Sequence, residues 1–286
     1  MAHIINPNAE EILDKEFKCL NAGFVRLIDY MGSDESIVQA ARVSYGKGTK
    51  TPSEDRILLR YLMRHRHTTP FEMVELKFHV KLPIFVARQW IRHRTANVNE
   101  LSGRYSIMKD EFFVPSEESI KAQTTKNKQG RGEEEVPLEL RRKVLDTILS
   151  DQQLNYNHYQ EFLKDDIARE IARINLPLSL YTQWYWKIDL HNLLHFLRLR
   201  IDKQAQYEIR VYAETIARIV ERITPLAWEA FEDYILNGER FSKAELKFIS
   251  DNLNITNLSK DSLEKYGLIG LEADEFLEKL KKLKCY

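Results

Sequence analysis

A basic cluster in the segment RQWIRHRTANVNELSGRY is the part of the chain best suited to chemistry. It holds Arg88, Arg92, Arg94 and Arg104 together with His93. Guanidinium groups bind carboxylates and phosphates through paired hydrogen bonds, although most charge runs are solvated faces. Apolar residues are interleaved with these arginines, and this interleaving favours an anionic nucleotide site. Structural salt bridges remain the alternative.

The spacing of residues in the first half of the cluster predicts which side chains share one face of a helix. If a helix persists to Arg94, then Gln89, Arg92 and His93 fall on one face through their three- and four-residue spacing. Arg92 and Arg94 then diverge by about 200° at 3.6 residues per turn. We therefore expect these two arginines to serve different partners.

The second half of the cluster is expected to be extended after Asn99. In that case alternate side chains point one way, namely Glu100, Ser102 and Arg104, and the others point away, namely Leu101, Gly103 and Tyr105. The first row offers an acceptor, a hydroxyl and a guanidinium, while a glycine lets a ligand approach the backbone. A nucleophilic serine needs a base within hydrogen-bond reach. Because nothing local identifies one, Ser102 is interpreted as a substrate-positioning residue.

Two patterned blocks, 23–115 and 138–236, must position this cluster, and we expect them to share one core. The polar segment 116–136 between them is interpreted as a surface loop, either a spacer or a lid. Thr51 begins a capping box for a helix that ends near His65. Strict alternation in ELKFHVKL indicates a strand, with the apolar side chains Leu76, Phe78, Val80 and Leu82 on one side.

Later elements follow in irregular order. Pro83 opens a helix that runs into the basic cluster, and LSLYTQWYWKI indicates a second strand. Asp189 caps the helix after it, and an amphipathic helix covers Gln204 to about Ile223. No repeated strand–helix–strand rhythm occurs, so the sequence predicts an α+β fold. We expect a single compact domain with a sheet flanked by helices, not a doubly wound one.

Composition excludes several classes of protein. The chain has 286 residues, with 43 basic and 43 acidic side chains, so no global positive field gathers nucleic acid or an anionic membrane. Cys19 and Cys285 match no disulfide framework or zinc spacing, and the histidine spacings predict no metal site. Neither a signal peptide nor a membrane span is evident, which indicates a cytoplasmic protein. Walker and Rossmann glycine patterns are absent from the sequence.

A longer motif within the basic cluster resembles the signature of flavin-dependent thymidylate synthases. Arg92-His93-Arg94, seven residues and then Ser102 reproduce that signature, which continues through Asn99-Glu100 and Arg104-Tyr105. Asn97 departs from it, because many members carry serine there. The resemblance runs from about residue 23 to residue 236, without the polar segment. It implies the fold of that family.

The resemblance also implies FAD as a cofactor. In the family a His-x-Thr-Pro-Phe-Glu segment binds FAD, and here it is matched by His67, Thr69, Pro70, Phe71 and Glu72. The other implied FAD contacts are Arg92, His93, Arg94, Glu100, Asp189, Leu190, His191 and His195. Asp189, His191 and His195 stand where some relatives have Asn, Arg and Asn. His195 could instead be a core histidine.

The implied substrate is dUMP. Its contacts carry over to Gln89, Trp90, Ile91, Arg92, Glu100, Leu101, Ser102, Gly103, Arg104, Arg173 and Arg200. Uracil C5 is a weak nucleophile until negative charge develops across N3 and O4, and a guanidinium at that edge stabilises the anion. Arg200 is the candidate for this catalytic role, whereas Arg104 and Arg173 would bind the phosphate. By pattern alone, Arg173 could be a surface helix arginine.

The resemblance further implies methylenetetrahydrofolate as carbon donor, NADPH as reductant, and a homotetramer with shared active sites. Folate-only thymidylate synthases use a catalytic cysteine, and neither Cys19 nor Cys285 is suited to that role. A flavoprotein oxidoreductase without carbon transfer is the main alternative, and a nucleic-acid-binding module is disfavoured by the neutral charge. We divide the chain into a catalytic domain, 1–237, and a charged helical extension, 238–286, to which the sequence assigns no role.

Overall fold

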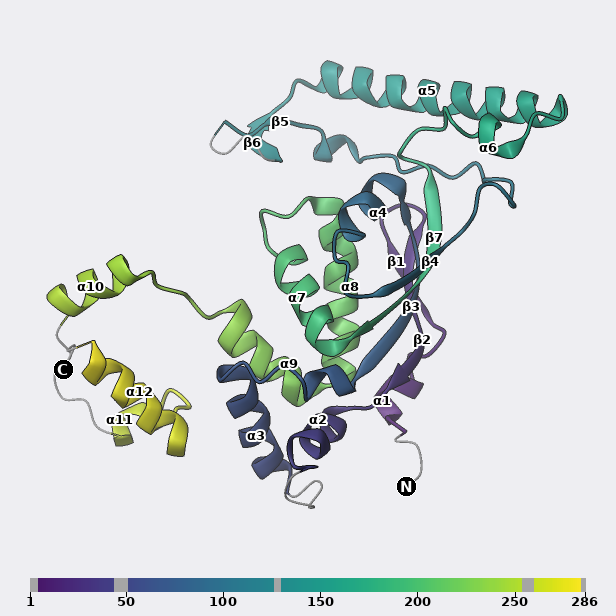
Figure 1. Ribbon diagram of the computed structural model, residues 1–286. Helices are drawn as coiled ribbons and strands as arrows, with labels where there is room; N and C mark the ends of the chain where they lie inside the picture. Colours follow the sequence, from purple (N-terminus) through teal and green to yellow (C-terminus); the bar gives the residue numbers. More distant parts are fainter. Residues whose placement is uncertain (1–4, 44–50, 126–129, 254–259, 284–286) are drawn as a thin grey trace.

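A five-stranded antiparallel sheet forms the centre of the chain (Figure 1). In the computed structural model, the described residues are 5–43, 51–125, 130–253 and 260–283. The strand order is β1-β2-β3-β7-β4. The strands are β1 (Glu16–Cys19), β2 (Gly23–Met31), β3 (Glu75–Pro83), β7 (Tyr181–Asp189) and β4 (Asn97–Glu100). Both blocks of the sequence therefore contribute to one sheet, as predicted.

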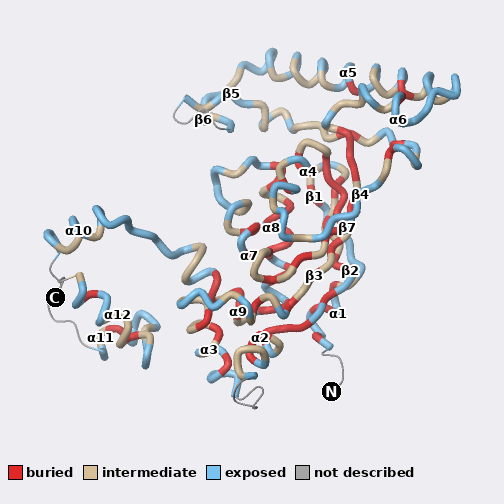
Figure 2. Tube along the Cα trace, in the orientation of Figure 1, coloured by how far each residue is buried: buried red, intermediate tan, exposed pale blue. Residues whose placement is uncertain are grey.

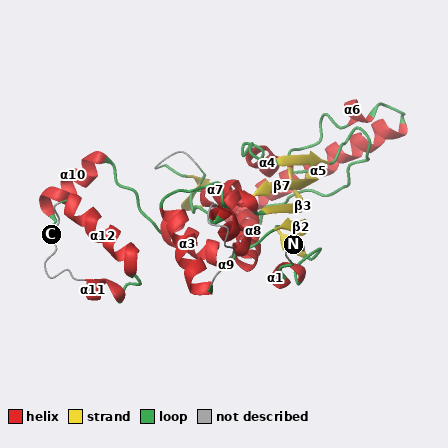
Figure 3. Cartoon of the chain, turned by 60° about the horizontal axis from the view of Figure 1, so that its bottom comes forward, coloured by secondary structure: helices red, strands yellow, loops and turns green. Residues whose placement is uncertain are grey.

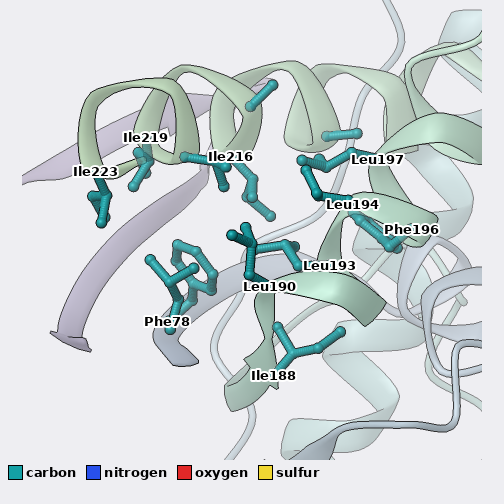
Figure 4. Packing of buried hydrophobic residues seen from close by; sticks show 14 of the residues in the cluster. Phe78, Ile188, Leu190, Leu193, Leu194, Phe196, Leu197, Ile216, Ile219 and Ile223 are labelled. Atoms are coloured by element: carbon teal, nitrogen blue, oxygen red, sulfur yellow. The ribbon is translucent and has the colours of Figure 1, made fainter. Parts of the chain in front are cut away.

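One face of the sheet is covered by the helices α7 (Leu190–Arg200) and α8 (Tyr207–Ile223) (Figures 1 and 3). The alternation predicted for 75–82 places Phe78 and Val80 in the core, where they are 0 % exposed. Figure 4 shows Phe78 and Ile188 beneath Leu193 of α7 and Ile216 of α8. Burial on one face only is typical of antiparallel sheets.

Several other helices and helical turns pack around this core. They are α1 (Pro7–Glu10), α2 (Asp34–Ala41), α3 (Pro52–Arg64), the 3-10 turn η2 (Phe71–Met73), α4 (Ile84–Trp90), α9 (Pro225–Phe231) and the π-helical turn η4 (Glu232–Leu236). Two predicted caps are confirmed. Thr51 forms the capping box of α3, and the Asp189 carboxylate accepts from the Asn192 amide at 2.9 Å.

A second, smaller cluster lies under α5 (Leu138–Lys164), where Tyr159 and Ala172 pack against Phe112 and Leu180. Next to α5 are α6 (Arg169–Ala172) and the hairpin of β5 (Lys121–Gln123) and β6 (Arg131–Glu135), after the turn η3 (Glu117–Ser119). Much of α5 is exposed (Figure 2). The segment 116–136 is thus not an irregular loop throughout, and its role as spacer or lid stays a prediction.

The C-terminal extension is helical, as expected, with α10 (Lys243–Asn252), α11 (Lys260–Glu264) and α12 (Gly270–Lys282). Ion pairs join α12 to α3. Arg60 Nη2 lies 3.1 Å from Glu272 Oε1, and Arg64 Nε lies 2.7 Å from Glu275 Oε2. The separate identity of this extension as a domain remains a prediction.

Two local expectations for the basic cluster are wrong. The helix that begins after Pro83 ends at Trp90 and does not reach Arg94, because the chain turns there to enter β4. The extended chain ends at Glu100. The carbonyl of Ser102 accepts from the amides of Tyr105 and Ser106 at 3.2 and 3.0 Å, and this turn breaks the expected row of Glu100, Ser102 and Arg104. The mixed α+β class itself is confirmed by the fold.

Candidate active site

His93 and Arg200 form the best-defined pair among the predicted site residues. Trp90, 0 % exposed, anchors the turn after α4 by stacking on Phe196 with ring centroids 4.8 Å apart. The turn brings His93 to α7, where its ring meets Phe196 edge-on at 4.9 Å. Arg200 Nε then donates a hydrogen bond to His93 Nε2 at 3.0 Å. Packing of large aromatic rings thus fixes a polar contact.

The electrostatics of this pair keep the imidazole neutral. Burial, followed by the positive charge of Arg200 and by the neighbouring His195, lowers the pKa of His93 to about 4. A neutral ring can accept at Nε2 while carrying its proton on Nδ1. Burial also lowers the pKa of Arg200, which remains a cation. None of the described residues hydrogen-bonds the terminal nitrogens of Arg200, so they remain available to a ligand.

A pocket of about 170 Å³ opens beside His195, between the end of α3 and α7. Its floor is apolar, with Leu62, Phe71, Leu194 and Phe231 buried. Its remaining lining is largely cationic or polar and includes Arg66, His67, Thr68, His191, His195, Arg198 and Arg240. Within the described ranges, Arg66, Arg198 and Arg240 form no ion pair with a carboxylate.

This pocket fits part of a flavin dinucleotide. An apolar floor suits a flat ring system, and unpaired guanidinium groups suit a diphosphate. The pocket is smaller than the roughly 300 Å³ typical of whole small-molecule sites. His191 and His195 line it, so His195 is exposed to the pocket and is not a core histidine. Thr69 is exposed just before η2, next to the lining residue Thr68.

Other predicted flavin contacts have local partners in the fold. Both carboxylate oxygens of Asp189 accept from Asn192, at 2.9 and 2.8 Å. Leu190 is 0 % exposed, and its amide donates to the Val74 carbonyl at 2.8 Å. Arg92 and Arg94 are exposed, and no residue in the described part of the chain pairs with either guanidinium.

A second group of predicted residues surrounds the turn 102–105. A Cβ added to Gly103 would lie 3.0 Å from Arg173 Nη1, which places this arginine directly against the turn. Arg104 Nε pairs with Glu170 of α6 at 2.9 Å. The Ser102 hydroxyl accepts from the Arg104 amide at 3.3 Å. Arg173 is therefore part of a cationic group at this turn and not an isolated surface arginine.

Two further predicted contacts are positioned by residues that the sequence reasoning missed. The Thr182 hydroxyl donates to Glu100 Oε1 at 2.7 Å. Gln89 Nε2 donates to Gln206 Oε1. Gln206 in turn donates to Glu208, and the sequence held a sign that Glu208 is buried. Glu208 lies four residues before the buried Tyr212, on the apolar stripe of α8. Leu101 and Ile91 are partly exposed, with 41 and 42 % of their surface accessible.

The single chain does not gather all these residues into one pocket. The flavin-side group, which we define as His93, His191, His195 and Arg200, belongs to α7 and the turn facing it. The turn-side group, defined as Ser102, Gly103, Arg104 and Arg173, belongs with α6. Figures 1 and 3 both place α6 beside α5 and away from α7. The two groups therefore belong to different parts of the fold.

Other chemistries find little support in the described part of the chain. Cys19 is buried, its thiol contacts Thr215 Oγ1 at 3.5 Å, and burial raises its pKa to about 11, so it is not a thiolate nucleophile. Cys285 lies outside the described residues. Among the residues described, no group of three His, Cys, Asp or Glu side chains is placed to hold a metal ion. No helix there has the length and apolar character needed to cross a membrane.

Comparison with solved structures gives the class of the fold. The UMP/dUMP methylase PolB from Streptomyces cacaoi, bound with 5-Br dUMP, matches with a TM-score of 0.69 and 31 % identity. The match covers 78 % of this chain and 100 % of PolB, and PolB bound with 5-Br UMP matches with a TM-score of 0.68. The chain therefore has the α+β fold of these nucleotide methylases.

Sequence comparison gives the family. The family described as thymidylate synthase complementing protein matches residues 26–226. A flavin-dependent thymidylate synthase from Wolbachia pipientis is 57 % identical, over 88 % of this chain and 88 % of that protein. One from Treponema denticola is 56 % identical, over 94 % of this chain and 98 % of that protein. The chain belongs to the flavin-dependent thymidylate synthase family, and the resemblance seen in the motif is confirmed.

The relatives' alignments extend beyond the family match. One from Rickettsia bellii covers 97 % of this chain at 50 % identity, so it includes much of 238–286. The likeness is therefore not confined to residues 23–236, and the C-terminal extension has counterparts in relatives.

Proposed function

We propose that this chain methylates dUMP to dTMP, with methylenetetrahydrofolate as carbon donor, NADPH as reductant and FAD as bound cofactor. Family membership supports the thymidylate synthase activity and the use of FAD. The observation that carries the proposal is the hydrogen bond from Arg200 Nε to the neutral ring of His93. It sets a guanidinium with free terminal nitrogens beside a cationic pocket.

Arg200 is the catalytic residue in this proposal. In dUMP, attack by uracil C5 requires negative charge to develop across N3 and O4. A guanidinium held at that edge stabilises the charge, and it acts most strongly when it is already oriented before reaction. His93 provides this orientation because it accepts at Nε2 and has no proton there to compete. Because the guanidinium is planar, this hydrogen bond at Nε also sets the orientation of the terminal nitrogens of Arg200.

The other site residues bind and orient. Arg104 and Arg173 would bind the nucleotide phosphate, whereas Gln89, Glu100 and the 102–104 turn would make further contacts with dUMP. In this chain Arg104 pairs with Glu170, an exposed ion pair that a dianionic phosphate can displace. His67, Thr69, Arg92, His93, Arg94, His191 and His195 would hold FAD. When bound, FAD supplies the redox chemistry of the reaction.

We propose that the active site is shared between copies of this chain in a homotetramer. The separation of the flavin-side group from the turn-side group supports a shared site. So do large apolar side chains that remain exposed on α5 and α6, among them Leu140, Leu149, Leu154, Phe162 and Ile171. A cytoplasmic location stays a prediction from the sequence.

Mixing two inactive variants tests the shared site. Arg104→Ala removes a turn-side residue, and Arg200→Ala removes a flavin-side residue. If the site is shared, refolding the two variants together restores part of the activity, because some sites receive both wild-type halves. If each chain contains a whole site, the mixture stays inactive, and light scattering of the wild type independently reports whether four chains associate.

The reaction itself is tested with the purified wild-type chain. We expect a flavin absorbance band, and NADPH oxidation accompanied by dTMP when dUMP and methylenetetrahydrofolate are both present. The absence of flavin would contradict the proposal. Flavin-dependent NADPH oxidation with no dTMP would instead support the alternative, a nucleotide-binding oxidoreductase without carbon transfer.

A further inference from the structure

An ion pair joins the β5–β6 hairpin to the start of α8. Glu208, in the first turn of α8, is buried, with 1 % of its side chain exposed. Arg131 Nη2 donates to Glu208 Oε1 and is its ion-pair partner among the described residues. Arg131 is the first residue of β6. A buried carboxylate needs such a partner, and removal of one member leaves an uncompensated charge.

The same carboxylate starts a chain of hydrogen bonds that ends at Gln89. Gln206 Nε2 donates to Glu208 Oε2 at 2.8 Å, and Gln89 Nε2 donates to Gln206 Oε1. An ionised carboxylate only accepts, so Gln206 must turn its NH₂ group toward Glu208. Its carbonyl oxygen then faces Gln89, which must also present its NH₂ group. The charge of Glu208 therefore sets the orientation of both amides.

Arg131 borders two cavities and also lies over the ring of Tyr207, with its guanidinium carbon 6.0 Å from the ring centroid. A cavity of about 380 Å³, lined by Lys121, Gln123, Gln204 and Gln206, lies on one side of it. Another of about 440 Å³, lined by Phe85 and Phe113 among others, includes Arg131 and Glu208 as well. The side chain thus borders open space, and a shorter or uncharged replacement creates no clash.

We propose that Arg131 is a positioning residue for the nucleotide: through Glu208 and Gln206 it holds Gln89 in the orientation that binds dUMP. This inference rests on the proposed function, because Gln89 is a nucleotide contact only there. Arg131 itself contacts neither reacting atoms nor cofactor. Its effect is transmitted to substrate affinity, whereas FAD binding on the α7 side is independent of it.

The test compares dUMP affinity and flavin content in variants of the full chain. Arg131→Met keeps the length of the side chain and removes its charge, while Arg131→Lys keeps a cation. Lys121→Met, on the same hairpin, is the matched control because it removes one charge without touching Glu208. We expect Arg131→Met to raise the Kd for dUMP by about tenfold, comparable to the loss of one oriented hydrogen bond. Flavin content is expected to be unchanged, and Arg131→Lys to recover much of the affinity.

A double-mutant cycle distinguishes positioning from general stability. In a Gln89→Ala background, Arg131→Met should change the Kd for dUMP by less than about twofold, because the residue that it orients is gone. Gln206 is exposed, and Gln206→Ala interrupts the hydrogen bonds between Glu208 and Gln89 without disturbing the ion pair. This variant should therefore weaken dUMP binding, and it provides a test even if Arg131→Met does not fold. The inference is overturned if Arg131→Met and Gln206→Ala both leave the affinity for dUMP unchanged. It is also overturned if Arg131→Met changes the Kd for dUMP equally in the wild-type and Gln89→Ala backgrounds. If the wild type binds no dUMP, the proposed function fails instead.

Discussion

Replacing His93 with phenylalanine tests whether a neutral acceptor orients Arg200. Phenylalanine preserves the edge-on contact with Phe196 at 4.9 Å but removes the nitrogen that accepts from Arg200 Nε at 3.0 Å. Glutamine is the complementary variant, since its side-chain oxygen can still accept. His158→Phe, on the exposed surface of α5, serves as a control for the substitution itself.

The magnitude follows from the kind of bond that is lost. A hydrogen bond to a charged group contributes about 1.5–3 kcal/mol net. If that orientation is realised in the transition state, kcat/KM for dUMP falls by roughly 10- to 150-fold in His93→Phe. His93→Gln should retain a substantial part of the activity. The assay is dTMP formation per bound flavin, so that any loss of FAD is counted separately.

The pH dependence gives a second readout, independent of catalysis. The pKa of His93 is lowered from 6.5 to about 4 in the folded protein, so the unfolded chain binds the proton at higher pH. Between pH 6.5 and about 4 the unfolded state therefore takes up more protons, and this residue's contribution to stability is lost as the pH falls. His93→Gln should show a weaker decline in the free energy of unfolding across that window. A His93→Phe enzyme within twofold of wild type, with an unchanged pH profile of stability, would refute the orienting role.

The remaining predictions concern catalysis, phosphate binding and folding. Arg200→Ala should keep its flavin absorbance and lose dTMP formation, and unchanged dTMP formation would contradict the role given to Arg200. Gly103→Ala places a methyl group 3.0 Å from Arg173 Nη1 and so should raise the KM for dUMP several-fold with little change in flavin content; an unchanged KM would argue against phosphate binding by this turn. Asp34→Ala removes the carboxylate that accepts from the first amides of α9 at 2.9 Å, and should lower the free energy of unfolding by about 1–2 kcal/mol in urea titrations. A loss well below that range would mean that water replaces the cap.

Sequence reasoning succeeded where local patterns decide the structure. The alternation in residues 75–82 and the cap at Asp189 are both short-range signals, and each appears as predicted. The helix over 84–94 failed for the opposite reason. Its end at Trp90 depends on the pairing of β4 with β7, which lies far along the chain. Local propensity contains no information about that partner.

In the candidate site, too, the sequence predicted the residues but not the tertiary contacts that position them. The family resemblance located His93 in the motif and Arg200 in a later segment, but their hydrogen bond depends on the packing of Trp90 against Phe196, a tertiary contact. The extended row through Ser102 was wrong because a side-chain hydroxyl and a carbonyl form a turn there, and such turns compete with the extended conformation. The roles given to individual site residues await the experiments described above.

The pairing of β3 with β7 has a consequence for how the chain folds. Phe78 opposes Trp186 at the centre of the sheet, although they are about a hundred residues apart in sequence. Contacts between residues so far apart in sequence slow folding, because the intervening chain must be brought round to close the sheet. Once that closure has been made, doubling the length of the intervening segment costs only about 0.6 kcal/mol more. Changes in the length of the segment between β3 and β7 should therefore leave the sheet able to form, even where they would displace Arg131 from Glu208.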